Sequence, residues 1–241
     1  MPASEKNASP QVPLRVANDI QLDHDIAALR RRVIREASRA TDLIRQSLMV
    51  LTDSTEAGVR EIREIEREID EEEVRIEEEC FRIMALQQPF GSDFRMLTFC
   101  LKVNSDIERL ADHAASIAKI SKKLMEIHLT WPKAMLEMIQ RVPLMCDELL
   151  RAVISADPDA AREVVARDKA IDKLDKQVFR ELTEIIQLNA GDASKYMLMY
   201  RVSRELERVG DLLGNIAEDI IYLVTGDIVR HEHKAVSNKP K

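Results

Sequence analysis

The sequence predicts an all-α protein made of two tandem, pseudo-symmetric three-helix bundles. Three observations predict this fold class. Charged residues make up 33% of the chain and aromatic residues only 4%, and the 241 residues contain only six glycines and eight prolines, a composition typical of long helices. Apolar residues recur every three or four positions, as on one face of a helix. The chain also contains an internal repeat at a spacing of 99 to 102 residues.

The first bundle is expected to contain three antiparallel helices joined by short turns. Their expected ranges are residues 20–54, 55–88 and 92–128. Gly58 marks the break after the first helix, and Pro89 with Gly91 ends the second. The upstream residues 1–19 are polar and contain three prolines. They predict a disordered tail without the apolar segment of an export signal.

The second bundle is expected to repeat this arrangement. Its helices are expected from Pro132 to the turn before Pro158, over 158–191 and over 192–226. Pro143 predicts a kink in the first of them. Asp157 and Asp192 are expected to cap the N-termini of the other two, and Gly226 is expected to end the last helix. The two bundles therefore span 20–128 and 129–228, and residues 229–241 form a second polar tail.

The repeat itself is visible in two pairs of segments. Glu66–Asp70 matches Asp168–Asp172 at an offset of 102 residues. Val103–Lys119 matches Val202–Glu218 at an offset of 99 residues. The small difference in offset falls in the turn between the second and third helix of each unit. Two copies of a three-helix unit therefore account for six helices.

Charge, cysteine content and hydropathy exclude several classes of protein. The net charge of −7 argues against a nucleic-acid-binding protein, which needs a basic face. The three cysteines include no CxxC pair and predict reduced thiols in a cytoplasmic protein. No run of 18 apolar residues predicts a membrane span.

Four acidic pairs at a spacing of four residues are the main candidate site. They are Glu66/Asp70, Glu108/Asp112, Asp168/Asp172 and Glu207/Asp211. This spacing places both carboxylates on one helix face, and the tight turns predict that the pairs gather in one cluster per repeat. Oxygen clusters suit divalent cations such as Mg²⁺, Ca²⁺ or Mn²⁺, and also iron. Acidic residues are so abundant that any single pair carries no information, and only the recurrence in both repeats indicates a metal site.

The alternative for these pairs is a purely electrostatic role with Arg109, Arg208 and other cations. His113, next to Asp112, is expected to be an exposed neighbour rather than a metal ligand. The small residues Gly210 and Gly214 are expected to allow close helix packing. The sequence contains no glycine-rich phosphate loop, no GxSxG, no HExxH and no Glu-x-x-His pair, so we expect no enzymatic activity.

Several segments resemble motifs of the PhoU family. Residues 88–95, QPFGSDFR, resemble its QPxxxDLR signature, and residues 107–112 and 206–211 resemble its paired LERIGD motifs. The resemblance covers about residues 20–231. Departures include Ala111 in place of glycine and Ser116 at the position equivalent to Asn215, so the first metal site need not match the second.

The resemblance implies a cytoplasmic negative regulator of high-affinity phosphate uptake and of the phosphate-starvation response. Its implied partners are the ATPase subunit of a phosphate ABC transporter and a sensor histidine kinase, which would hold it peripherally at the inner membrane. It also implies a homodimer, and metal clusters on the acidic pairs in some relatives. The alternatives are a metal store and a metalloenzyme built on the carboxylate bundle.

Overall fold

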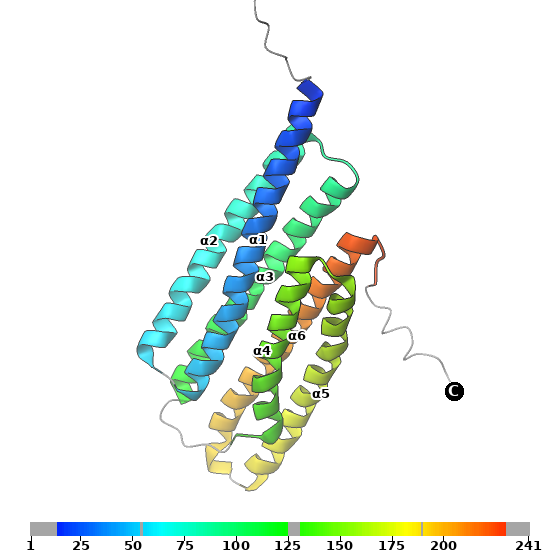
Figure 1. The fold of residues 1–241 in the computed structure, drawn as a ribbon. Coiled ribbons are helices and arrows are strands. Elements are labelled where there is room, and N and C mark those ends of the chain that lie inside the picture. The colour runs from blue at the N-terminus through cyan, green and yellow to red at the C-terminus, as the bar shows by residue number, and fades with distance from the viewer. Residues whose placement is uncertain (1–13, 54, 125–130, 189, 230–241) are drawn as a thin grey trace, which may run out of the picture.

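The computed structural model describes residues 14–53, 55–124, 131–188 and 190–229, and within these ranges the regular structure is entirely helical. The helices, shown in Figure 1, are α1 (Leu14–Thr52), α2 (Glu56–Gln87), α3 (Ser92–Leu124), α4 (Lys133–Ser155), α5 (Pro158–Leu188), the short 3₁₀ helix η1 (Ala190–Asp192) and α6 (Ala193–Thr225). The expected all-α fold is confirmed.

Helix α1 begins at Leu14, six residues before the expected start. The sequence has no glycine or proline between Leu14 and Thr52, so nothing in the backbone stops the helix at Ile20. The expected boundary between the N-terminal tail and the first helix, after residue 19, is therefore wrong. Residues 1–13, 125–130 and 230–241, on which the rest of both tails and the expected end of the third helix fall, lie outside the described residues. Val229, the first residue of the expected C-terminal tail, packs against the core.

The helix ends match most of the expected signals. The Asp157 side chain accepts hydrogen bonds from the backbone N–H groups of Asp159 and Ala160 at 2.9 and 3.2 Å. Gly226 ends α6 in the left-handed region with φ of 79°. Asp192 is the N-cap residue of α6, as expected, but its side chain makes no capping hydrogen bond and pairs instead with Lys195 at 2.7 Å. A turn of 3₁₀ helix precedes α6.

The six helices form two three-helix bundles that pack side by side (Figure 1). Helices α1, α2 and α3 contact one another, as do α4, α5 and α6. The bundles meet along α3 and α6, with a further contact between α1 and α4. The buried apolar side chains of both bundles form one connected core. The fold therefore places the α2–α3 hairpin, the α5–α6 hairpin and the α3–α6 seam next to each other.

Two further sequence interpretations concern the cysteines and the membrane. Cys80, Cys100 and Cys146 are buried free thiols. Burial raises the pKa of each thiol to about 12, which keeps these thiols protonated and unreactive. Among the described helices, none combines the length and the apolar character that a bilayer crossing requires.

Candidate metal centres and an adjacent hollow

The acidic pairs of the second repeat lie together on facing sides of α5 and α6. Carboxylate oxygens of Asp172, Glu207 and Asp211 all lie within 4.8 Å of one another. Asp168 joins them, since burial and then the charges of Asp211, Asp172 and Glu207 raise the pKa of its carboxyl to about 7. Burial also raises the pKa of Glu207. This group of Asp168, Asp172, Glu207 and Asp211 is called cluster 2 below.

Two glycines of α6 make room for Asp168. A Cβ atom at Gly210 would lie 3.1 Å from Asp168 Oδ1 and 3.3 Å from Ile171 Cγ2. A Cβ atom at Gly214 would lie 3.7 Å from Asp168 Cγ. The Asp168 carboxyl therefore lies against the bare backbone of α6, and the expected close packing at these glycines is confirmed. A side chain at position 210 would push this carboxyl away from its neighbours.

The acidic pairs of the first repeat form a corresponding group on α2 and α3, called cluster 1: Glu66, Asp70, Glu108 and Asp112. The pKa of Glu108 is raised to about 7 by burial and then by the charges of Asp112, Glu73 and Asp70. Burial, Asp70 and Asp112 raise the pKa of Glu66, whose carboxyl lies within hydrogen-bonding reach of the Asp112 carboxyl. The structure thus groups all eight predicted residues by repeat.

Both clusters contain carboxylate oxygens that no hydrogen bond satisfies. Asp70 Oδ1, Asp168 Oδ1 and Glu207 Oε2 are buried and have no hydrogen-bond partner among the described residues. A buried polar atom without a partner costs free energy, and a carboxylate among other carboxylates costs more. A hard cation bound by these oxygens would remove both costs. The residues of cluster 2 therefore fit such a cation, since three of their oxygens also lie close together. Cluster 1 offers one unsatisfied oxygen, Asp70 Oδ1, and no comparable set of three close ligand atoms among the described residues.

Arginines compensate the clusters only in part. Arg204 Nη1 lies 3.0 Å from Glu207 Oε1 of cluster 2 and 2.9 Å from Asp175 Oδ2. Arg109, which the electrostatic alternative invoked, lies 3.4 Å from Asp106. Its charge lowers the pKa of Glu108 less than the acidic neighbours raise it.

Each repeat also contains a third acidic position that the four predicted pairs do not include. Glu73 and Asp175 follow Asp70 and Asp172 by three residues, on the same helix face, and they are 102 residues apart. Asp175 is 5% exposed and accepts a 2.8 Å hydrogen bond from Ser203 Oγ. The repeat offset, applied to every acidic residue rather than to the pairs alone, would have found both positions.

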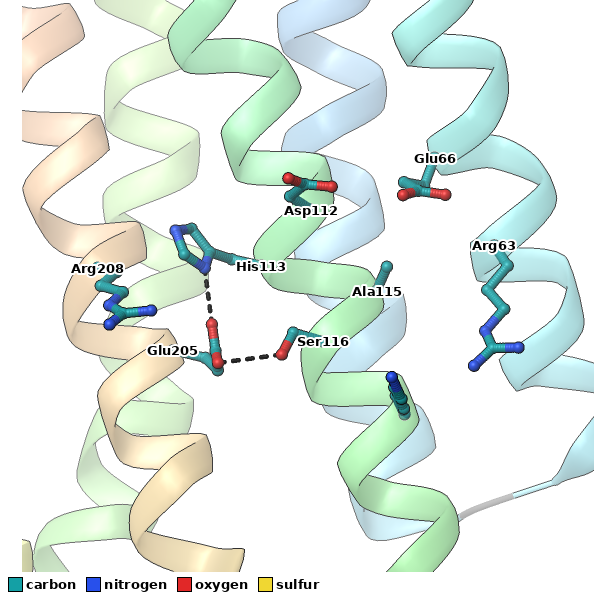
Figure 2. A pocket seen from close by; sticks show the side chains of 9 residues that line it. Arg63, Glu66, Asp112, His113, Ala115, Ser116, Glu205 and Arg208 are labelled. Atoms are coloured by element: carbon teal, nitrogen blue, oxygen red, sulfur yellow. Dashed lines mark hydrogen bonds and ion pairs between the residues drawn. The ribbon is translucent and has the colours of Figure 1, made fainter.

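Beside cluster 1 lies a hollow of about 530 Å³ between α2, α3 and α6. Figure 2 shows α3 in its centre, with Glu66 and Arg63 of α2 on one side and Glu205 and Arg208 of α6 on the other. His113 Nδ1 lies 2.7 Å from Glu205 Oε2, and Ser116 Oγ donates a 3.0 Å hydrogen bond to Glu205 Oε1.

The expectation that His113 is an exposed neighbour of Asp112 is therefore wrong. Its side chain is only 14% exposed and pairs with Glu205 across the seam between the bundles. Burial opposes ionisation of Glu205, but the hydrogen bonds from His113 and Ser116 and the charge of Arg208 hold the pKa of Glu205 below its usual range. The contact was missed because the sequence gives no sign that α3 packs on α6.

The comparisons with known proteins agree with this two-bundle arrangement. A family model described as the PhoU domain matches residues 33–121 and again residues 135–220, one match in each bundle. A phosphate-specific transport system accessory protein PhoU homologue from Pseudomonas aeruginosa is 31% identical over 214 residues, which is 88% of either chain. The corresponding homologue from Deinococcus radiodurans is 35% identical over 69% of this chain and 78% of its own.

Solved structures show the same similarity in three dimensions. The crystal structure of PhoU from Pseudomonas aeruginosa superimposes with a TM-score of 0.80 at 30% identity, covering 85% of this chain and 99% of that one. The phosphate transport system regulatory protein PhoU from Streptococcus pneumoniae gives a TM-score of 0.75 at 26% identity, with 86% and 99% coverage.

Proposed function

Because the chain belongs to the PhoU family, we propose that it is a cytoplasmic regulator of phosphate homeostasis that restrains high-affinity phosphate uptake. The observation that carries this proposal is the extent of the match, since both repeats and 88% of the chain align with a relative named as an accessory protein of phosphate-specific transport. A second relative of known structure is named as a regulatory protein of phosphate transport.

The proposed mechanism is that of an adaptor. The chain would contact the ATPase subunit of a phosphate ABC transporter and a sensor histidine kinase, acting as a homodimer at the inner membrane through these partners. In this role it catalyses no reaction. The competing functions, a metal store or a metalloenzyme, would need metal release or turnover, and assays of metal-free and metal-loaded protein separate them from the adaptor.

The two carboxylate clusters are proposed to hold divalent or iron cations that stabilise the adaptor. Cluster 2 has the more compact set of oxygens, with three carboxylates inside 4.8 Å and two of the unsatisfied oxygens, Asp168 Oδ1 and Glu207 Oε2. A bound cation would supply positive charge between α5 and α6, in addition to the Arg204 guanidinium that contacts Glu207. The chain's own residues would hold the two helices at a fixed separation around it.

A deletion strain tests the regulatory proposal. Without the gene, phosphate-uptake genes are expected to stay expressed in phosphate-rich medium, and the wild-type gene on a plasmid should restore repression. Transcript levels of the transporter genes in high and low phosphate are the measurement. Capture of the transporter ATPase from membranes of phosphate-replete cells by the tagged protein tests the partner. Normal repression in the deletion strain would contradict the proposal.

A further inference from the structure

Arg204 of α6 joins two carboxylates that lie at different places in the second bundle. Its Nη1 atom donates a hydrogen bond to Asp175 Oδ2 at 2.9 Å and lies 3.0 Å from Glu207 Oε1. The Asp175 side chain is 7% exposed and the Glu207 side chain is 15% exposed, so salt and solvent screen these contacts only weakly. Asp175 lies outside the four predicted pairs, whereas Glu207 is a candidate metal ligand. One guanidinium group therefore links a buried carboxylate to cluster 2.

The buried carboxylate, Asp175, holds Arg204 in place. Asp175 Oδ1 accepts a 2.8 Å hydrogen bond from Ser203 Oγ, and Asp175 Oδ2 accepts the hydrogen bond from Arg204. Ser203 is itself buried, which leaves this arrangement little room to move. A charge-assisted hydrogen bond such as the one from Arg204 is stronger than a bond between neutral groups. The position of the guanidinium beside Glu207 is thus set by residues that do not belong to cluster 2.

This arrangement is confined to the second repeat. At the offset of 99 residues, Ser105 and Asn104 stand where the second repeat has Arg204 and Ser203. The Asn104 side chain donates to the backbone carbonyl of Glu73 at 2.8 Å, and Ser105 carries no charge. The repeat whose candidate ligands lie within 4.8 Å of one another is therefore also the repeat that places this arginine against one of them.

A divalent cation in cluster 2 must share Glu207 with Arg204. Two positive groups on one carboxylate repel each other, and each reduces the negative charge available to the other. Arg204 contacts Glu207 Oε1, whereas Glu207 Oε2 and Asp168 Oδ1 have no hydrogen-bond partner among the described residues, so the arginine compensates the cluster only in part.

We propose that Arg204 competes with the metal at cluster 2. It stabilises the metal-free form of the cluster and weakens binding of the cation, and it thereby sets the metal concentration at which cluster 2 fills. This inference rests on the metal binding proposed above, and it assigns to Arg204 and its anchor Asp175 the control of that site.

Calorimetric titration of the full chain with Mn²⁺ tests the inference. The Glu207→Gln/Asp211→Asn protein lacks two ligands of cluster 2 and so identifies the binding event that belongs to this cluster. Arg204→Gln is expected to bind Mn²⁺ there about tenfold more tightly than the wild type, the effect of removing a competing hydrogen bond to a charged group. Arg204→Lys keeps the charge and should bind more weakly than Arg204→Gln. Arg201→Gln, which neutralises an exposed arginine one turn earlier on α6, is the matched control and should bind as the wild type does.

The stability of the metal-free protein is the second readout. In EDTA, Arg204→Gln should melt at a lower temperature than the wild type, because Asp175 and Glu207 lose the group that compensates their charges. The inference therefore expects lower stability together with tighter metal binding, whereas a purely structural role of Arg204 would weaken both. If Arg204→Gln does not fold, Asp175→Asn/Arg204→Gln removes the pair without leaving a buried charge, and it is likewise expected to bind Mn²⁺ more tightly than the wild type.

Each proposal has its own contrary result. Equal or weaker Mn²⁺ binding by the folded variant, with binding retained in the wild type, would overturn the role of Arg204 and leave the metal proposal intact. Arg204→Lys as tight as Arg204→Gln would overturn competition by charge, and an unchanged melting temperature of Arg204→Gln in EDTA would overturn stabilisation of the metal-free form. Absence of Mn²⁺ binding at cluster 2 in the wild type and in the variant would overturn both proposals.

Discussion

Replacing Asp168 by Asn should stabilise the metal-free protein. The carboxyl of Asp168 is half-buried against α6 and surrounded by Asp172, Glu207 and Asp211, which together with burial raise its pKa from 3.8 to about 7. Because the folded-state pKa lies above the unfolded value, this group favours folding below about pH 4, and that contribution is lost as the pH rises through about 7. Asn has the shape of the protonated carboxyl and carries no charge at any pH.

The size of the effect follows from the same pKa. A rise from 3.8 to about 7 corresponds to about 4 kcal/mol, and the partial exposure of this side chain reduces it to about 2 kcal/mol through solvent screening. For a chain of this length, 1 kcal/mol shifts the melting temperature by about 2 to 4 °C. Near pH 8 and in EDTA, Asp168→Asn is therefore expected to melt about 4 to 8 °C higher than the wild type.

Denaturant unfolding at about pH 8 and about pH 5, both in EDTA, measures this prediction. Near pH 5 the carboxyl of Asp168 is largely protonated in the folded state but ionised in the unfolded state, so the difference between Asp168→Asn and the wild type should fall to about 40% of its value near pH 8. Glu163→Gln, an exposed neutralisation on the same helix, is the matched control and should show little change at either pH. A destabilised Asp168→Asn protein near pH 8, or a gain that is independent of pH, would refute the reasoning.

Two further predictions concern the same cluster. Gly210→Ala should lower the free energy of unfolding by about 1 to 3 kcal/mol, since its Cβ would lie 3.1 Å from Asp168 Oδ1 and 3.3 Å from Ile171 Cγ2. The control in the same melts is Gly191→Ala, whose Cβ would have nothing within 4 Å. An equal loss of stability in both variants would contradict the packing argument. Saturating metal, at about 100 times its dissociation constant, should stabilise the wild type by about 2.7 kcal/mol, and Glu207→Gln with Asp211→Asn should remove the contribution of cluster 2. Melting curves that coincide in EDTA, Mg²⁺, Mn²⁺ and Fe²⁺ would contradict metal binding and indicate that the clusters are solvated helix faces.

The sequence predicted the helices and the grouping of the acidic pairs because both depend on short stretches of chain. Glycine and proline positions divide the chain into helices, and apolar spacing defines the face that each helix buries. The tight turn after Gln88 makes α2 and α3 antiparallel, which places Asp70 level with Glu108. The repeat extends the same argument to Asp172 and Glu207. The start of α1 at Leu14 escaped this reasoning because polar composition does not prevent a helix.

Only the tertiary structure decided what lies between the two bundles. His113 and Glu205 are 92 residues apart, and their contact exists because α3 packs on α6. The internal repeat shows that α3 and α6 are equivalent helices of the two bundles, but this equivalence does not show whether the two helices contact each other. The buried faces of both bundles are apolar, and many pairings of such faces satisfy the hydrophobic effect about equally, since it has no direction. The choice among them depends on side-chain shape over the whole interface, and this choice brought Arg63, Lys119 and Arg208 around one hollow.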